Sequence, residues 1–288
     1  MSLAKHETVA VWPAGARLAH QAAPQRGDEG KDLGAGEHRD QRAGDREVLI
    51  RVDEPRVRRS IGRPLEHFTH EREPLLDRCA DVVKGRTDIE VILVDNGSTD
   101  DSPAILQTLL PQYPGCRSVR VDRNQGYGFG ILSGLRAAQG DILGWTHADM
   151  QTDPQDFLRG LQYFEQHGHQ LFVKGRRYGR PMADVAFTVG MSLFETALLK
   201  TPLWDINAQP TMFSKAFFDT WQDPPHDFSL DLFAYYMARK AGLTVHRFPV
   251  HFGERAHGVS HWNVNWAAKR KFIKRTVDFS LDMKRSLK

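Results

Sequence analysis

Cysteine and long uncharged apolar runs are scarce in this sequence of 288 residues. The two cysteines, Cys79 and Cys116, have neither the number nor the spacing of a disulfide framework or a zinc site, which fits a reducing cytoplasm. The N-terminus lacks the apolar segment of a signal peptide. The segment nearest to a membrane span is residues 185–194, which lies between Asp184 and Glu195. It is well short of the roughly 18 uncharged residues that a membrane span needs. The expectation is a globular cytoplasmic protein without a membrane-spanning segment.

Aromatic residues are nearly absent from residues 1–70. Only Trp12 and Phe68 occur there, against 26 aromatic residues in the other 218. Arg, Gly, Asp, Ala and His dominate this segment without a helical or strand period. Because such a composition buries little apolar surface, we expect disorder or loose association, with residues 47–52 as the one candidate strand.

Basic charge is concentrated at the C-terminal end. The formal net charge is +3, but residues 262–288 hold eight Lys or Arg against two Asp, which leaves about −3 for the remainder. Ile273, Val277 and Leu281 recur every four residues and form an apolar stripe on a predicted helix. Such a helix suits peripheral association with an anionic membrane, and it equally suits packing on a catalytic domain with a solvated basic face. Nucleic acid is not expected as a partner, because no binding motif accompanies the local basic residues.

From residue 71 onward, strand and helix patterns alternate, which indicates βαβ units and a mainly parallel sheet. The fold class is therefore α/β, a mainly parallel sheet flanked by helices after an atypical N-terminal segment. The expected helices are residues 73–84, 103–110, 124–139, 156–167, 185–199, 230–241 and a last one from about 264. The expected strands are residues 89–94, 118–121, 142–146, 171–175, 208–214 and 244–250.

The strand at residues 89–94 ends in the turn-forming segment Asp95-Asn96-Gly97-Ser98-Thr99. This segment places short oxygen-bearing side chains at the carboxyl end of a strand, where open α/β sheets bind ligands. An acidic strand-to-helix loop without a ligand is the alternative. A second polar cluster about fifty residues downstream makes ligand binding the preferred interpretation.

The second cluster, His147-Ala148-Asp149-Met150-Gln151, follows the strand at residues 142–146. Because alternate residues of an extended segment face the same side, His147, Asp149 and Gln151 can reach one point, near Asp95 at the same sheet edge. An imidazole, a carboxylate and an amide oxygen suit Mn²⁺ or Mg²⁺ bridging a diphosphate. The alternative is a polar loop in which His147 only caps its neighbours.

Several blocks of sequence, in order, form one family pattern. They are Val-Asp-Asn-Gly-Ser-Thr-Asp-Asp at 94–101, Asn124-x-Gly126 with Gly130, Gly134, Ala138, Gly140 and Asp141, His-Ala-Asp-x-Gln at 147–151, Val-Lys-Gly-Arg-Arg-Tyr at 173–178, residues 205–211, and Arg255-x-x-Gly258-x-Ser260. Together they resemble the family 2 glycosyltransferases of GT-A fold, in particular the polyprenyl-phosphate sugar synthases of the dolichyl-phosphate mannose synthase type. The resemblance covers about residues 71–262 and implies a nucleotide-sugar donor and a divalent metal, Mn²⁺ or Mg²⁺.

The resemblance implies donor-side roles by position. Asp95, with its neighbours Asn96 and Ser98, is expected to contact the base or ribose of the nucleotide sugar. The expected metal ligands on the donor diphosphate are His147, Asp149 and Gln151.

The resemblance also implies phosphate ligands. Arg177, Arg255 and Ser260 are expected to hold phosphate oxygens of the donor or of a lipid acceptor, because guanidinium groups match phosphate geometry. For both arginines, a surface salt bridge is the alternative. Asp231 is the candidate general base if the acceptor is a hydroxyl, whereas a lipid phosphate is already ionised at pH 7 and needs no base. A helix-start carboxylate is the alternative for Asp231.

Two departures from the family pattern bear on activity. His147 stands where the family usually has Asp, so the site loses one negative charge and metal affinity should fall. The family also opens with a buried strand ending in Pro-x-x-Asn-Glu, which this sequence does not show. We therefore hypothesise that residues 1–70 are an out-of-frame or foreign leader and that the sheet lacks its first strand, unless residues 47–52 fill the gap.

Three segments follow: an atypical leader at 1–70, a catalytic domain at 71–262 and a basic amphipathic helix at 263–288. The expected function is inverting, metal-dependent transfer of a sugar from a nucleotide-sugar donor to a polyprenyl phosphate or membrane-associated saccharide, at the inner face of the cell membrane. One alternative is a polysaccharide or O-antigen transferase with a hydroxyl acceptor. Another is a catalytically inactive nucleotide-sugar-binding protein.

Overall fold

The computed structural model describes residues 8–14, 74–99, 102–149, 151–253 and 266–286. The candidate strand at residues 47–52 lies outside these ranges, as do Arg255 and Ser260.

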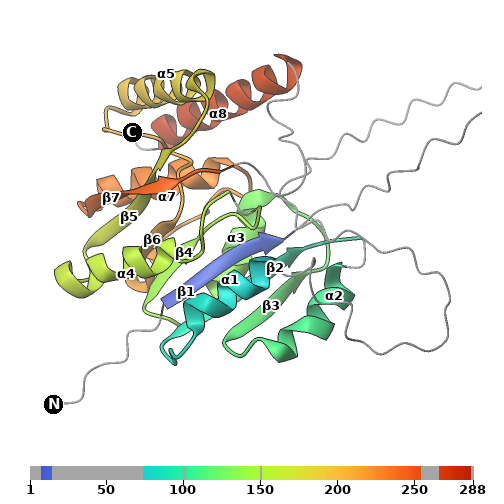
Figure 1. Ribbon diagram of the computed structural model, residues 1–288. Coiled ribbons are helices and arrows are strands. Elements are labelled where there is room, and N and C mark those ends of the chain that lie inside the picture. Colours follow the sequence, from blue (N-terminus) through green and yellow to red (C-terminus); the bar gives the residue numbers. More distant parts are fainter. Residues whose placement is uncertain (1–7, 15–73, 100–101, 150, 254–265, 287–288) are drawn as a thin grey trace, which may run out of the picture.

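The described strands form one seven-stranded sheet in the order β3-β2-β1-β4-β6-β5-β7 (Figure 1). Strands β1, β2, β3 and β4 run parallel, β6 runs antiparallel to both β4 and β5, and β7 runs parallel to β5. The carboxyl ends of all strands except β6 therefore lie at one edge of the sheet. The strands are β1 Thr8–Ala14, β2 Ile89–Asn96, β3 Cys116–Val121, β4 Ile142–Trp145, β5 Leu171–Tyr178, β6 Thr211–Ser214 and β7 Thr244–His251.

Helices cover both faces of the sheet and create two hydrophobic cores. One core joins the sheet to α3, α7 and α8, and the other joins it to α1, α2 and α4. Helix α5 packs beside α8, at the end of the molecule away from α1 and α2 (Figure 1). The helices are α1 Pro74–Val83, α2 Ser102–Leu109, η2 Leu110–Gln112, α3 Tyr127–Ala137, α4 Asp156–His167, α5 Met182–Leu199, α6 Lys215–Phe218, α7 Ser229–Lys240 and α8 Trp266–Ser286.

The apolar run of β2 is explained by these two cores. Ile92 and Val94 point into the core under α3, while Val91 and Leu93 point into the core under α1. Both faces of the strand are buried, so its sequence does not alternate between apolar and polar residues. The prediction of a doubly covered, mainly parallel sheet is confirmed.

The first strand of the sheet is present, so the prediction that the sheet lacks it is wrong. Strand β1 lies at the centre of the sheet, where it pairs in parallel with β2 on one side and β4 on the other. Its residues include Val9, Val11 and Trp12, which favour strands, but Pro13 and the polar surroundings hid the pattern. The position of β1 depends on its pairing with two strands that are distant in the sequence. A local sequence pattern does not reveal such pairing.

Candidate active site

The loop after β2 is held in one conformation by its own side chains. Asp95 is 2% exposed, and its Oδ1 accepts a hydrogen bond of 2.9 Å from the backbone N–H of Ser98. Its Oδ2 accepts a hydrogen bond and ion pair from Arg120 on the neighbouring strand β3. Gly97 has a φ of +76°, and a Cβ there would lie 2.3 Å from the backbone N of Asn124, so the turn requires glycine.

A chain of contacts connects this loop to the loop after β4. Asn96 donates a hydrogen bond of 3.0 Å to the carbonyl of Gly126, directly before α3. The next residue, Tyr127, places its ring 5.7 Å from the ring of His147. The carboxyl ends of β2 and β4 also flank that of β1 in the parallel sheet. The two polar clusters therefore lie at one edge of the sheet, as the sequence predicts.

The loop after β4 is fixed to the end of β7. Asp149 is 4% exposed, and its Oδ1 accepts a hydrogen bond of 3.1 Å from the backbone N–H of Gln151. Gln151 is bound to Gly253 twice: its Nε2 donates to the Gly253 carbonyl over 3.1 Å, and its carbonyl accepts from the Gly253 N–H over 2.9 Å. The metal role of His147, Asp149 and Gln151 stays a prediction.

The donor atoms at this loop limit the kind of metal site that they can form. Across the described residues, no three His, Cys, Asp or Glu side chains converge as metal ligands. One carboxylate, Asp149, with the imidazole of His147 and the amide of Gln151, fits a cation held partly by substrate phosphate oxygens. The same set does not fit a cage made by the protein alone.

The loop after β2 presents acceptor and donor atoms suited to a nucleotide. Asn96 Oδ1 and Ser98 Oγ are buried and have no hydrogen-bond partner among the described residues. Gly130 brings α3 against Asn96, since a Cβ there would lie 2.9 Å from the Asn96 amide. Buried polar atoms are normally satisfied, so these two favour a bound polar ligand. The donor-binding roles of Asp95, Asn96 and Ser98 stay predictions.

Arg177 lies in a buried cluster of charges. Its guanidinium binds Asp205, with Nε donating over 3.0 Å. Arg180 and Arg247 approach the same carboxylate, at 3.7 Å and 3.6 Å. Burial raises the pKa of Asp205, but the charges of Arg177, Arg247 and Arg180 outweigh burial and hold that pKa below its usual value. The ion pair with Asp205 corresponds to the salt-bridge alternative for Arg177, but it is buried and not at the surface. The role of Arg177 in phosphate binding stays a prediction.

A buried polar network lies beneath His147, and sequence reasoning identified only one of its members. Asp231 is 1% exposed, and its Oδ2 accepts a hydrogen bond of 3.1 Å from the Tyr127 hydroxyl, which in turn accepts one of 2.8 Å from Gln209. Lys174 is fully buried and donates to Thr211 Oγ1 over 2.8 Å. The signal for Lys174 was its presence inside the apolar strand β5, where a charge needs a partner.

Burial dominates the protonation of this network. It lowers the pKa of Lys174 to about 7, although the nearby Asp231 carboxylate opposes the change. Burial also raises the pKa of Asp231, against the opposing charges of Lys174 and His147. Asp231 is enclosed by the protein next to Tyr127 and does not project to the molecular surface.

This doubly covered sheet, with two polar loops at its carboxyl edge, has the GT-A fold that the solved glycosyltransferase structures described below share. The chain belongs to the Glycosyl transferase family 2, whose sequence profile matches residues 68–221.

Solved structures share this fold at low sequence identity. Glucosyl-3-phosphoglycerate synthase from Mycobacterium tuberculosis, in complex with Mn²⁺, UDP-glucose and phosphoglyceric acid, has a TM-score of 0.57 and 15% identity, over 96% of this chain and 80% of that chain. A mannosyltransferase from Pyrobaculum calidifontis, in complex with GDP-Man and Mn²⁺, has a TM-score of 0.51 and 14% identity, over 88% of this chain and 59% of that chain.

Curated relatives match a shorter part of the chain. An undecaprenyl-phosphate 4-deoxy-4-formamido-L-arabinose transferase of Serratia proteamaculans is 30% identical over 115 residues, which are 39% of this chain and 35% of that protein. The enzyme of the same name from Sodalis glossinidius is 39% identical over 72 residues, 24% of this chain and 22% of that protein. The matched segments thus span about a third or less of these relatives.

Proposed function

We propose that this protein transfers a sugar from a nucleotide-sugar donor to a polyprenyl phosphate, with inversion at the anomeric carbon and with a divalent metal. The observation that carries the proposal is the pair of polar loops, after β2 and after β4, at one edge of a family 2 glycosyltransferase sheet. Inversion rests on the family resemblance alone.

The donor occupies the edge between these loops. Asp95, Asn96 and Ser98 bind the base or ribose, because they combine a fixed carboxylate with two buried polar atoms that have no hydrogen-bond partner within the described ranges. Asp149, with His147 and Gln151, would hold Mn²⁺ or Mg²⁺ at the donor diphosphate. A bound metal would supply positive charge that stabilises the departing diphosphate.

Burial of Asp231 favours a phosphate acceptor over a hydroxyl acceptor. A general base must come within hydrogen-bond reach of the hydroxyl that it deprotonates. Asp231 is 1% exposed and already accepts a hydrogen bond from Tyr127. A lipid phosphate is ionised at pH 7 and attacks without a base. The curated relatives carry the name of undecaprenyl-phosphate transferases, which supports the same acceptor class.

The presence of β1 weakens the case for a catalytically inactive binding protein. That alternative rested on a missing first strand and on His147 in place of a carboxylate. Strand β1 completes the sheet next to both polar loops, so only the substitution at His147 remains. We place the reaction at the cytoplasmic face of the membrane, where the basic α8 associates peripherally with anionic lipid.

Donor and acceptor are tested with the purified full-length chain. Calorimetry with UDP and GDP, each with and without Mn²⁺, measures nucleotide binding. Transfer of radiolabelled sugar to undecaprenyl phosphate in detergent micelles, compared with transfer to soluble glycans, identifies the acceptor. Labelling of undecaprenyl phosphate supports the proposal, whereas labelling of glycans alone establishes the hydroxyl-acceptor alternative. Nucleotide binding without any turnover establishes the inactive alternative.

Asp149→Asn is the matching site variant. It should reduce metal-dependent turnover by at least a hundredfold while the protein stays folded, because the only carboxylate among the predicted metal ligands is lost. Asp153→Asn is the control, since Asp153 lies four residues after Asp149 and forms an exposed ion pair with Arg78. Unchanged activity of Asp149→Asn would remove Asp149 from the metal role.

A further inference from the structure

The exposed residues of helix α5 are all apolar or small, whereas its polar residues face the protein. The outward positions recur at three- and four-residue spacing, so they form a single face of the helix. We call this surface the outer face of α5. It consists of Met182, Ala183, Ala186, Gly190, Leu193, Phe194 and Ala197.

Three side chains of the outer face are large, apolar and exposed. Met182 is 81% exposed, Leu193 59% and Phe194 40%. A Cβ added at Gly190 would meet no atom within 4 Å. The charged or hydroxyl-bearing side chains of α5 are instead half-buried or buried on the other side; they are Asp184, Thr188, Ser192, Glu195 and Thr196.

Hydrogen bonds fix the polar side of α5 to the rest of the protein along its length. Arg180 donates to Thr188 Oγ1 over 2.7 Å, the backbone N–H of Asp205 donates to Ser192 Oγ over 2.9 Å, and that of Leu203 donates to Thr196 Oγ1 over 3.0 Å. The 18 residues of α5 have a mean hydropathy of 1.4, enough by length and composition to cross a membrane. Because the polar side of α5 is hydrogen-bonded to the domain, the outer face is the side that is free to enter lipid in the fold described here.

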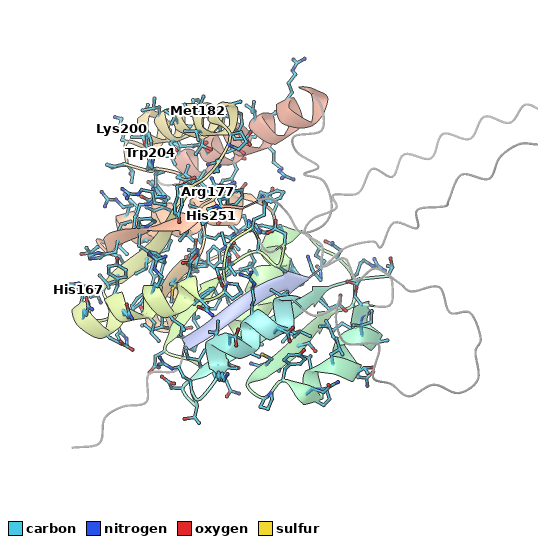
Figure 2. All side chains as sticks on the ribbon, in the orientation of Figure 1. His167, Arg177, Met182, Lys200, Trp204 and His251 are labelled. Atoms are coloured by element: carbon cyan, nitrogen blue, oxygen red, sulfur yellow. The ribbon has the colours of Figure 1, made fainter. Side chains whose placement is uncertain are left out.

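The surroundings of α5 match a lipid surface. Tyr178, before the helix, is 55% exposed and Trp204, after it, is 45% exposed. Such aromatic side chains are enriched at membrane–water interfaces. Figure 2 shows Met182, Lys200 and Trp204 gathered around α5, away from His167 at the end of α4. The neighbouring α8 carries seven Lys or Arg against two Asp, which complements anionic lipid.

We propose that the outer face of α5 inserts into the headgroup and acyl boundary of an anionic bilayer, with the helix lying in the membrane plane. This goes beyond the proposed peripheral contact of α8, because α5 supplies the apolar anchor and α8 supplies the charge. A second copy of the chain is the weaker occupant. A helix of 18 residues offers roughly 27 Å by 10 Å, or about 270 Å², far below the roughly 800 Å² per partner of a stable interface.

Flotation of the full-length chain with vesicles tests the proposal. The probes are vesicles of phosphatidylcholine alone and of phosphatidylcholine with 30% phosphatidylglycerol, without donor or acceptor. Wild-type protein should float with the anionic vesicles. The double variant Leu193→Asp/Phe194→Asp should bind at least tenfold more weakly, whereas Gly190→Leu, which adds apolar surface at an open position, should bind a few fold more tightly.

Two controls separate α5 from other surfaces. Gln162→Asp adds one negative charge at an exposed position of α4 and should bind within twofold of wild type. Leu281→Asp removes an exposed apolar side chain of α8 and should reduce binding less than the α5 double variant does. Brominated lipid should quench the tryptophan fluorescence of the wild-type protein more than that of Trp204→Phe. This comparison leaves the outer face of α5 unchanged.

Three results would overturn the proposal. One is a folded α5 double variant that floats as wild type does. Another is wild-type protein that binds neither kind of vesicle. The third is a wild-type dimer that the double variant converts to a monomer, which would make the outer face an interface between copies. None of these readouts depends on sugar transfer, so failure of the proposed reaction and failure of this membrane contact are distinguishable.

Discussion

Glu195 is a carboxylate on the buried side of α5, in an environment that disfavours its charge. It lies on α5 with no solvent exposure, and burial raises the pKa of its carboxyl to about 7, although Ser280 of α8 opposes the change. In the sequence, Glu195 is only a charged residue that ends an apolar run. Its position between α5 and α8 is a consequence of tertiary packing.

Replacing Glu195 by Gln should increase stability at pH 8 and leave it nearly unchanged at pH 5. With a pKa of 4.5 unfolded and about 7 folded, the wild-type carboxyl destabilises the fold as pH rises from about 4.5 to about 7, because only the unfolded state releases the proton. The full effect is at most roughly 3 kcal/mol. Urea unfolding from pH 5 to 8 measures it, with the exposed Glu165→Gln of α4 as control. Equal pH dependence in Glu195→Gln and wild type would contradict the prediction.

His147 should respond to replacement by Asp with tighter metal binding. A second carboxylate beside Asp149 adds negative charge to a donor set of oxygen ligands, which Mn²⁺ and Mg²⁺ favour. We expect about a tenfold gain in Mn²⁺ affinity in the presence of UDP, measured by calorimetry. His167→Asp, at the exposed end of α4, is the control and should not change the affinity. A loss of affinity in His147→Asp would show that the imidazole itself is the required ligand.

At the scale of elements, the turn between β2 and α2 depends on backbone geometry more than on side-chain chemistry. Gly97 combines a positive φ with a close approach to the segment before α3. Asp95 and Arg120 then hold the turn from the other side. The motif Asp-Asn-Gly-Ser predicted the turn and its ligand-binding position, but not the ion pair with β3.

Gly97→Ala should destabilise the protein by about 3 kcal/mol or more and abolish nucleotide binding. A side chain at positive φ costs roughly 1–2 kcal/mol, and the contact with Asn124 adds a backbone clash. Gly85→Ala isolates the clash, because Gly85 has a φ of +70° but open space around its Cβ position. Urea unfolding and UDP calorimetry check both variants. Similar losses in the two variants would mean that the approach to Asn124 is not limiting.

At the scale of the whole molecule, β1 joins the two halves of the site. It separates β2 from β4 in the sheet, so the polar loops after those strands face each other across its carboxyl end (Figure 1). By its position in the sequence, β1 belongs to the atypical leader at 1–70, and 59 residues lie between its last residue and α1. The boundaries of the three predicted segments stay a prediction, but the leader contributes a central strand.

Val11→Pro should prevent cooperative folding. Val11 pairs with Ile92 on one side and Trp145 on the other, so the missing N–H and fixed φ of proline disrupt a central ladder. We expect a loss of about 3 kcal/mol or more. Val11→Ile keeps the N–H and the branched shape and is the matched control. Circular dichroism with thermal unfolding measures both, and a stable Val11→Pro protein would exclude β1 from the sheet centre.

The sequence alone determined the alternating elements from residue 71 onward, the two polar loops and the family. These features are local: a buried apolar run ends in turn formers, and each pattern is complete within about ten residues. The order of the parallel strands then required both loops to meet at one edge. That edge was predictable because parallel strands share the direction of their carboxyl ends.

Only the tertiary structure decided the position of β1, the pairing of Arg177 with Asp205, the burial of Asp231 with Lys174, and the outward apolar face of α5. Each depends on groups far apart in the chain, such as Tyr127 and Asp231, whose contact no local pattern encodes. Helix α5 is the clearest case. Its composition predicts an apolar helix, but which side meets solvent is fixed by the hydrogen bonds that its polar side makes with the 203–205 segment.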